Sequence, residues 1–164
     1  MKKLSVILWF LLCSISLVSQ AQNSISLSNK SPIFMDLTHS FNAGVPRQVI
    51  VDDSQWLNYT TLMRPSDPTF SITIEIAMGS IPDGLELQVE ASPYSGGSKD
   101  RAGTPTNKIT VTHTPRILID NIGTCYTGSG KNEGHRLTFS FVITDYSKLQ
   151  SGTTSIYVQY TIKQ

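Results

Sequence analysis

Cysteine is scarce in this chain, which has two cysteines among its 164 residues. Cys13 lies in an apolar N-terminal segment, so a chain that loses this segment keeps Cys125 alone. A single cysteine excludes an intrachain disulfide, and a domain of this length is large enough to fold without one. We therefore expect Cys125 to be either a buried small apolar residue or a reactive thiol.

Charge is also scarce, since only 15% of the residues are charged. The whole chain has a formal charge of +1, and without Lys2 and Lys3 it has 11 basic and 12 acidic residues. Proteins that bind nucleic acids or anionic membranes need a basic patch, and this chain has no run of basic residues. We expect no nucleic-acid partner.

Long apolar runs are absent except at the N-terminus. Lys2 and Lys3 precede the apolar segment Leu4–Val18, and Ser19-Gln20-Ala21 then places small residues where a signal peptidase cleaves. This layout predicts a cleaved signal peptide at residues 1–21, with an N-terminal anchor helix as the alternative. The mature protein, residues 22–164, is then secreted, periplasmic or on the cell surface. Contact with the membrane is expected only during export.

Helical periodicity is missing after this segment, and the apolar residues instead alternate with polar ones. In TFSITIEIA, for example, Phe70, Ile72, Ile74 and Ile76 fall on one face of an extended chain. The pattern predicts strands at Ile25–Leu27, Phe34–Phe41, Gln48–Val51, Trp56–Leu62, Thr69–Ala77, Leu85–Ala91, Lys108–Thr114, Leu137–Thr144 and Ser155–Lys163.

Glycine- and proline-rich turns separate these strands, and the longest lies in the loop Ser92–Asn107. Asp145–Gln150 offers no more than one helical turn. Many short strands with one apolar face each predict an all-β protein with one domain at residues 22–164. The expected fold is a single antiparallel β-sandwich, Greek-key or jelly-roll-like. A closed β-barrel is the alternative.

The segment Gly128-Ser129-Gly130-Lys131 resembles a phosphate-binding loop but lacks its essential residues. Cys125 stands where the motif needs its first glycine, Asn132 replaces the hydroxyl residue, and a strand pattern follows instead of a helix. We interpret the segment Gly123–Gly134 as a connection whose glycines form turns. The sequence indicates no nucleotide site here.

The same connection brings Cys125 within ten residues of His135, so the two could form a thiol and base pair. The alternative is a buried cysteine without chemistry. The histidines show no metal-binding spacing, and the scattered acids predict no catalytic pair. We therefore expect no catalytic residue, no metal and no cofactor, and whether the protein is an enzyme stays open.

Aromatic side chains suggest a second kind of site. Tyr94, Trp56 and Tyr126 are candidates for stacking on a sugar if they share an exposed face. Tyr94 is the best of them because it lies in the long glycine-rich loop. The alternative is that Trp56 fills the core of the sandwich.

Two segments carry a resemblance to known proteins. The stretch IGTCYTGSGKNEGHRLTFSF and the closing VQYTI resemble small secreted all-β proteins of bacteria, which have a Gly-rich Cys-Tyr-Thr-Gly loop. More distantly, the chain is similar to spore-coat-U and chaperone–usher pilin sandwiches, which are completed by a strand from the next subunit. Ile156–Ile162 resembles the strand that pilins offer to a chaperone, and Asn23–Ser28 alternates as a donor strand does.

This resemblance implies an exported, non-catalytic structural or surface-assembly protein, such as a fimbria-like subunit. Its partners would be other protein subunits, bound by strand addition. The alternative function is an extracellular carbohydrate-binding module that uses the aromatic residues above to bind glycans.

Overall fold

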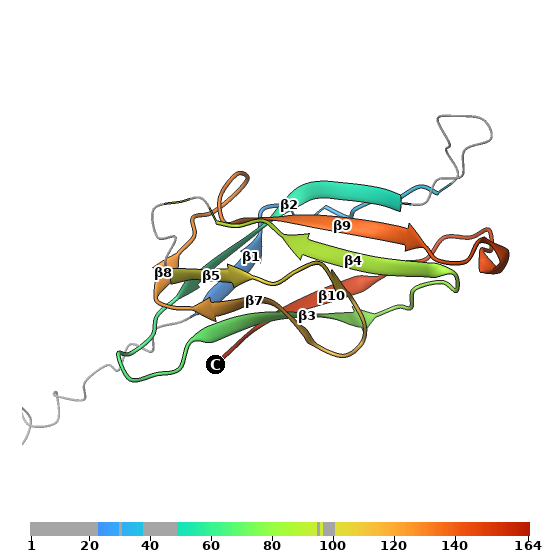
Figure 1. Ribbon diagram of the computed structural model, residues 1–164. Helices are drawn as coiled ribbons and strands as arrows, with labels where there is room; N and C mark the ends of the chain where they lie inside the picture. Colours follow the sequence, from blue (N-terminus) through green and yellow to red (C-terminus); the bar gives the residue numbers. More distant parts are fainter. Residues whose placement is uncertain (1–22, 30, 38–48, 95, 97–100) are drawn as a thin grey trace, which may run out of the picture.

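The computed structural model describes residues 23–29, 31–37, 49–94, 96 and 101–164 (Figure 1). The expected signal peptide therefore lies outside the described residues. Two antiparallel sheets pack face to face as a sandwich, which confirms the predicted all-β class and excludes the closed barrel. The strands are β1 (Ser24–Leu27), β2 (Val49–Thr61), β3 (Phe70–Met78), β4 (Leu85–Ala91), β5 (Ala102–Pro105), β6 (Ile109–Thr110), β7 (Arg116–Ile122), β8 (Cys125–Tyr126), β9 (His135–Ile143) and β10 (Tyr157–Lys163).

The first sheet, which we call sheet A, has the strand order β1-β2-β9-β4-β6, and β8 pairs with the end of β2. The second, sheet B, has the order β10-β3-β7-β5. A short 3₁₀ helix, Tyr146–Lys148, follows β9 and is the single helical turn expected from the sequence. Asp145 caps it through a hydrogen bond from the Ser147 amide to its carboxylate at 3.0 Å.

Several predicted strands differ from those observed. The predicted strands Gln48–Val51 and Trp56–Leu62 are not separate, because residues 49–51 and 56–61 lie in one strand, β2, whose pairing with β9 shifts register between Asp52 and Gln55. Gln48 lies outside the described residues, and Leu62 follows the end of β2. Residues 34–37 form no strand, while residues 38–41 lie outside the described part of the chain. Lys108–Thr114 contributes only the two residues of β6. Three strands were not predicted at all: β5, β7 and β8.

The core lies between the sheets and is built from the inward faces of the strands. Ile72 and Ile74 of β3, Leu118 of β7, and Val89 and Leu137 of sheet A are fully buried. Burying each of these side chains contributes about 1.5–3 kcal/mol relative to leaving it in water. The strict alternation seen in the sequence is therefore the direct cause of the two-sheet architecture.

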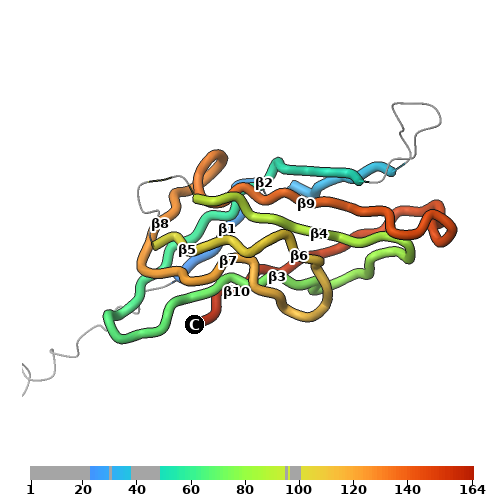
Figure 2. The backbone as a smooth tube through the Cα atoms, in the orientation of Figure 1, coloured from blue at the N-terminus to red at the C-terminus, as the bar shows by residue number. Residues whose placement is uncertain are grey.

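The two described chain ends lie at the same end of the sandwich (Figure 2). The side-chain oxygen of Asn23 accepts a hydrogen bond from the Leu62 amide at 3.0 Å, and the side chain of Gln164 donates to the Pro68 carbonyl at 3.2 Å. Leu62 and Pro68 both belong to the connection between β2 and β3. On one side of the sandwich, β1, an edge strand of sheet A, contacts β10, an edge strand of sheet B.

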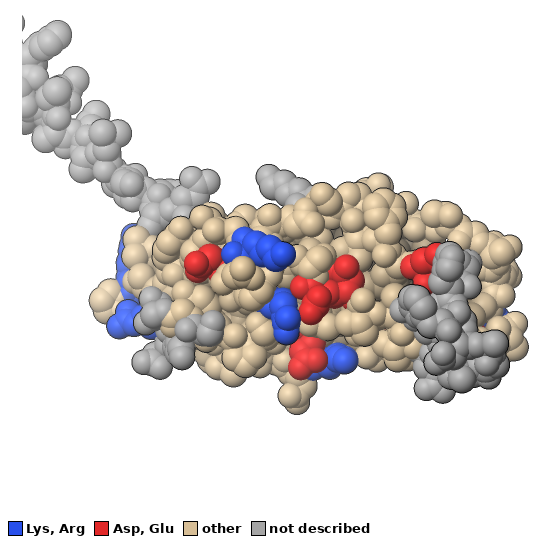
Figure 3. All heavy atoms as spheres, turned by 90° about the horizontal axis from the view of Figure 1, so that it is seen from above, with Lys and Arg blue, Asp and Glu red and all other residues tan. Residues whose placement is uncertain are grey.

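The outward face of the molecule shown in Figure 3 carries basic and acidic groups near one another rather than one large patch of a single sign. Two exposed ion pairs lie on sheet A, Lys108 with Glu90 at 3.9 Å and Arg136 with Asp53 at 3.2 Å. In the described ranges no helix is long and apolar enough to cross a membrane.

Candidate functional site

The most densely bonded group in the interior surrounds His135, the first residue of β9. Its ring is fully buried and stacks on Tyr59 of β2, with ring centroids 5.7 Å apart and planes 8° apart. His135 Nδ1 lies 2.7 Å from the Ser92 carbonyl oxygen, and Nε2 lies 2.8 Å from the Tyr59 hydroxyl. The Tyr59 hydroxyl also contacts the carbonyl oxygen of Ala102. One histidine thus connects β2 and β9 to both ends of the connection between β4 and β5.

The hydrogen bonds determine the protonation state of this cluster. A carbonyl only accepts, so Nδ1 carries the proton that is donated to Ser92. The Tyr59 hydroxyl has a single proton, which in the neutral cluster goes either to the Ala102 carbonyl or to Nε2. Burial lowers the pKa of His135, although its bonds to the Ser92 and Ala102 carbonyls oppose the shift. Burial likewise raises the pKa of Tyr59 strongly. Both groups are therefore neutral at pH 7 and sealed from solvent, an arrangement suited to holding the fold.

We expect the free energy of unfolding to fall as the pH drops below about 6.5, the ordinary pKa of histidine. Because the pKa of His135 is lowered in the folded protein, the unfolded chain binds a proton first, and stability is lost toward the folded-state pKa. The slope is at most about 1.4 kcal/mol per pH unit for one proton. Urea unfolding at pH 7.5, 6.5 and 5.5 measures it. A His135→Phe variant that keeps the same slope would assign it to another group.

Cys125 is a core residue, and its hydrogen-bond partner differs from the partners of His135. Its side chain is 6% exposed and belongs to the core cluster, and its sulfur lies 3.3 Å from the Thr61 hydroxyl. Burial raises the pKa of the thiol. Among the described residues no hydrogen bond joins Cys125 to His135. The observed geometry is that of a packed, protonated cysteine.

The three candidate aromatic residues occupy different surroundings. Trp56 does not fill the core, because it stands opposite the exposed Arg136 on the outward face of sheet A and is only half-buried. Tyr126 is also outward, opposite Thr60, and is 61% exposed. Tyr94 instead follows β4 and packs against the buried ring of His135, with centroids 5.8 Å apart. The structure thus separates Tyr94 from the other two.

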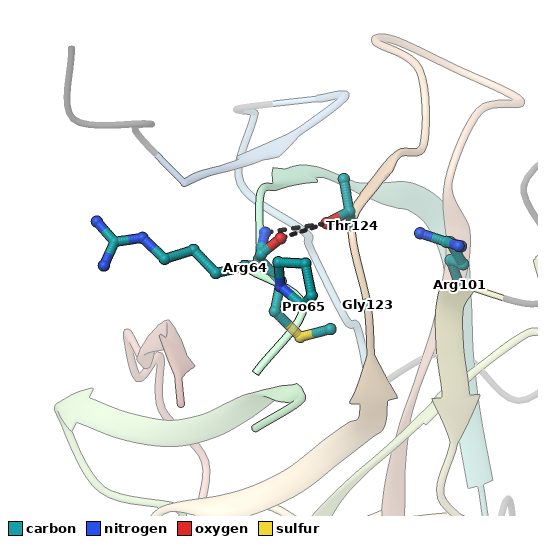
Figure 4. A pocket seen from close by; sticks show the side chains of 6 residues that line it. Arg64, Pro65, Arg101, Gly123 and Thr124 are labelled. Carbon is teal, nitrogen blue, oxygen red and sulfur yellow. Dashed lines mark hydrogen bonds between the residues drawn. The ribbon is translucent and has the colours of Figure 1, made fainter. Parts of the chain in front are cut away.

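One shallow hollow of about 370 Å³ lies between the end of β2 and the β7–β8 connection (Figure 4). Among the residues that line it, Thr124 accepts a hydrogen bond through Oγ1 from the Met63 amide at 2.9 Å. Arg64 and Arg101 both line it, which suggests an anion site. However, Figure 4 shows that their guanidinium groups lie on opposite sides and do not converge. This hollow therefore offers no paired arginines for an anion.

The edge of β10 is a third feature. β3 is its only hydrogen-bonded neighbour in the part of the chain that the structure describes. The amide of Ile76 donates to Thr112 at 2.8 Å, on the side of β3 away from β10. Val158 stands opposite Ile76 in a pair that exchanges no hydrogen bonds. In such an antiparallel pair both residues point their backbone groups outward, so the N–H and C=O of Val158 point away from β3. By alternation the same holds for Tyr160 and Ile162, so the backbone groups of these three residues point to the edge of the sheet, where no described strand pairs with them.

The side chains of these residues face inward but are incompletely covered. Val158, Tyr160 and Ile162 are half-buried, and so are Ile25 and Leu27 of the neighbouring strand β1. The hydroxyl oxygen of Tyr160 is buried and makes no hydrogen bond with the described residues. Burial without a partner raises the pKa of this tyrosine well above its usual value. A buried hydroxyl without a partner is costly, by about 1–3 kcal/mol.

Sequence reasoning did not identify two of these features. The hydrogen bond between Tyr59 and His135 joins residues 76 positions apart. The one sequence signal for it is that Tyr59 alternates with Leu57 on the inward face of the strand, which predicts burial of Tyr59 but not its partner. The position of β10 at the edge of sheet B depends on the order of the strands, and no local sequence pattern predicts that order. In the described ranges no group of three or more His, Cys, Asp or Glu side chains is placed to hold a metal ion.

Comparisons with protein-family models, with curated proteins and with solved structures give no match for this chain.

Proposed function

We propose that this protein is an exported, non-catalytic structural subunit that joins other copies of itself by strand addition at β10. The observation that carries the proposal is the open edge of this strand, which is seven residues long and contains no proline. Natural sheets normally protect such edges because they pair readily with another chain. Export is the expectation drawn from the N-terminal segment.

The other sheet edges support this choice by contrast. β6 has only two residues, and β5 has four and ends in Pro105, which lacks a backbone N–H. β1 also has only four residues. Among the described edge strands, β10 is therefore the longest, and its centre contains no proline. The half-covered side chains beside it are the apolar positions that an added strand would bury.

The partner is expected to be a strand from a second copy. Asn23–Ser28 pairs with β2 of its own chain, where Ser28 N–H donates to Trp56 O at 2.9 Å. It can act as a donor only by leaving this position, as in domain swapping. The alternative donor is β10 itself, which would pair with its own copy across a twofold axis.

Blocking the edge of β10 is expected to abolish self-association. In Val158→Pro, the substitution removes an N–H that points away from β3, so the ladder to β3 keeps its hydrogen bonds. Sedimentation velocity should then show concentration-dependent association of the wild-type protein and only monomer for the variant. Val158→Thr is the matched control, because it keeps the N–H and the branched shape.

The outcomes separate the alternatives. Association that survives Val158→Pro, with a folded circular-dichroism spectrum, or a wild-type protein that is monomeric at every concentration, would contradict the proposal. Deletion of residues 22–28 then tests the donor. Loss of association identifies the N-terminal segment as the donor, whereas retained association points to pairing between two copies of β10.

A further inference from the structure

Tyr94 belongs to a cluster of three aromatic rings centred on His135. The Tyr59 ring and the Tyr94 ring both contact His135, with interplanar angles of 8° and 38°. Tyr59 and His135 are buried, whereas Tyr94 is half-buried. Tyr94 is therefore the member of the cluster that reaches the surface.

Tyr94 also lines a hollow of about 410 Å³ between the end of β4 and strand β5. This volume lies in the range of small-molecule sites. Pro93 and Pro105 supply apolar walls, and the exposed side chains of Glu90, Thr104 and Asn107 supply hydrogen-bonding groups. The hollow therefore combines an aromatic ring with neutral and acidic polar groups.

We propose that this hollow binds a neutral, polyhydroxylated ring, such as the pyranose ring of a sugar, against Tyr94. Such a ring has an apolar C–H face that fits an aromatic side chain, and hydroxyl groups that match Thr104 and Asn107. The carboxylate of Glu90 at the rim accepts hydrogen bonds from hydroxyls and repels anions. Its one ion pair with a described residue, Lys108, is long and exposed, so Glu90 keeps accepting capacity.

The surroundings of Tyr94 hold the ring in place before any ligand arrives. His135 packs against the ring and donates a hydrogen bond to the carbonyl of Ser92, two residues before Tyr94. Gly96 passes so close to the hydroxyl end of Tyr94 that a Cβ atom there would collide with it. A side chain held in this way loses little conformational freedom on binding, which favours affinity.

Saturation-transfer NMR with glucose, galactose, mannose and N-acetylglucosamine tests the proposal on the intact protein. At least one of these sugars should receive saturation from the wild-type protein. Tyr94→Ala should weaken its binding by about tenfold or more, the loss expected for one stacked aromatic contact. Tyr94→Phe should retain most of the binding, because it keeps the ring. Tyr157→Ala, which removes an exposed tyrosine of β10, is the matched control and should bind as wild type.

Absence of saturation transfer to all four sugars would overturn the proposal, and so would binding that Tyr94→Ala leaves unchanged. If Tyr94→Ala fails to fold, Asn107→Ala serves instead, because Asn107 is exposed and lines the hollow. Binding that is unchanged in this variant and in Thr104→Ala would then overturn the proposed hydrogen bonds. The proposal is independent of self-association, which the β10 variants measure separately.

Discussion

Gly134→Ala is expected to destabilise the protein by about 2–4 kcal/mol. Gly134 has a φ of +73°, a conformation that costs a residue with a side chain about 1 kcal/mol. In addition, a Cβ at this position would collide with the backbone carbonyl of Leu57, which cannot move without disturbing β2. Forcing such an overlap in a packed region costs a further 1–3 kcal/mol or so. Urea unfolding measures the change, and the melting temperature should fall by roughly 5–15 °C.

Gly130→Ala is the matched control for this prediction. Gly130 lies in the same connection and also has a positive φ, of +101°, but no atom lies within 4 Å of the position that a Cβ would take. The control should therefore show the conformational cost alone, about 1 kcal/mol. Equal losses in the two variants would show that the approach of Gly134 to Leu57 contributes nothing.

His135→Phe is expected to lower the free energy of unfolding by about 2–4 kcal/mol at pH 7.5. Phenylalanine keeps an aromatic ring next to Tyr59 and Tyr94 but removes both nitrogens. The Ser92 carbonyl then loses its 2.7 Å donor, and the Tyr59 hydroxyl loses its contact with Nε2 but keeps the Ala102 carbonyl. A buried polar group left without a partner costs about 1–3 kcal/mol. The larger phenyl ring adds strain in a closely packed site.

The control for this substitution is His113→Phe. His113 is exposed, and its one hydrogen bond to the described residues, from Nδ1 to the Ile76 carbonyl, is 3.1 Å long. This variant should lose less than about 1 kcal/mol, the net value of one ordinary hydrogen bond. A loss at His135 as small as the loss at His113 would refute the structural role assigned to the buried cluster.

Strands with strict alternation were predicted almost residue for residue. Leu85–Ala91 matches β4 in both bounds, and Thr69–Ala77 matches β3 within one residue at each end. In these segments every second residue is apolar, so a local pattern is enough to place the strand and its inward face. The expectation that the connection before β9 contains glycine turns is also confirmed, because Gly128, Gly130 and Gly134 have positive φ values.

The missed strands lack that local pattern. In β7, Leu118 and Ile119 are both buried although they are adjacent, and the pairing of β3 with β7 shifts register near these residues. Asn121, in the same strand, has a φ of +57°. β5 lies in a segment rich in glycine and proline and exists because β7 supplies hydrogen bonds along it. Its strand character comes from its neighbour, as does that of the two-residue β8.

The candidate residues divide in the same way. Cys125 and His135 are close in sequence, and their partners Thr61 and Tyr59 are two residues apart on β2. Among the described residues no hydrogen bond joins Cys125 to His135, so closeness along the chain did not make them a bonded pair. Tyr94 was singled out for its position in a glycine-rich loop, and the structure adds its packing on His135 and the hollow beside it.

The sequence by itself determined the all-β class and the inward face of each regular strand, because alternation of apolar and polar residues is a property of neighbouring positions. It also determined that a chain without residues 1–21 cannot form an intrachain disulfide, because Cys125 is then its only cysteine. Only the tertiary structure decided that β10 is an edge strand of sheet B and that Tyr59 and Tyr94 both contact the ring of His135. These features depend on strand order and on contacts between distant residues, which are set by how the whole chain buries its apolar faces.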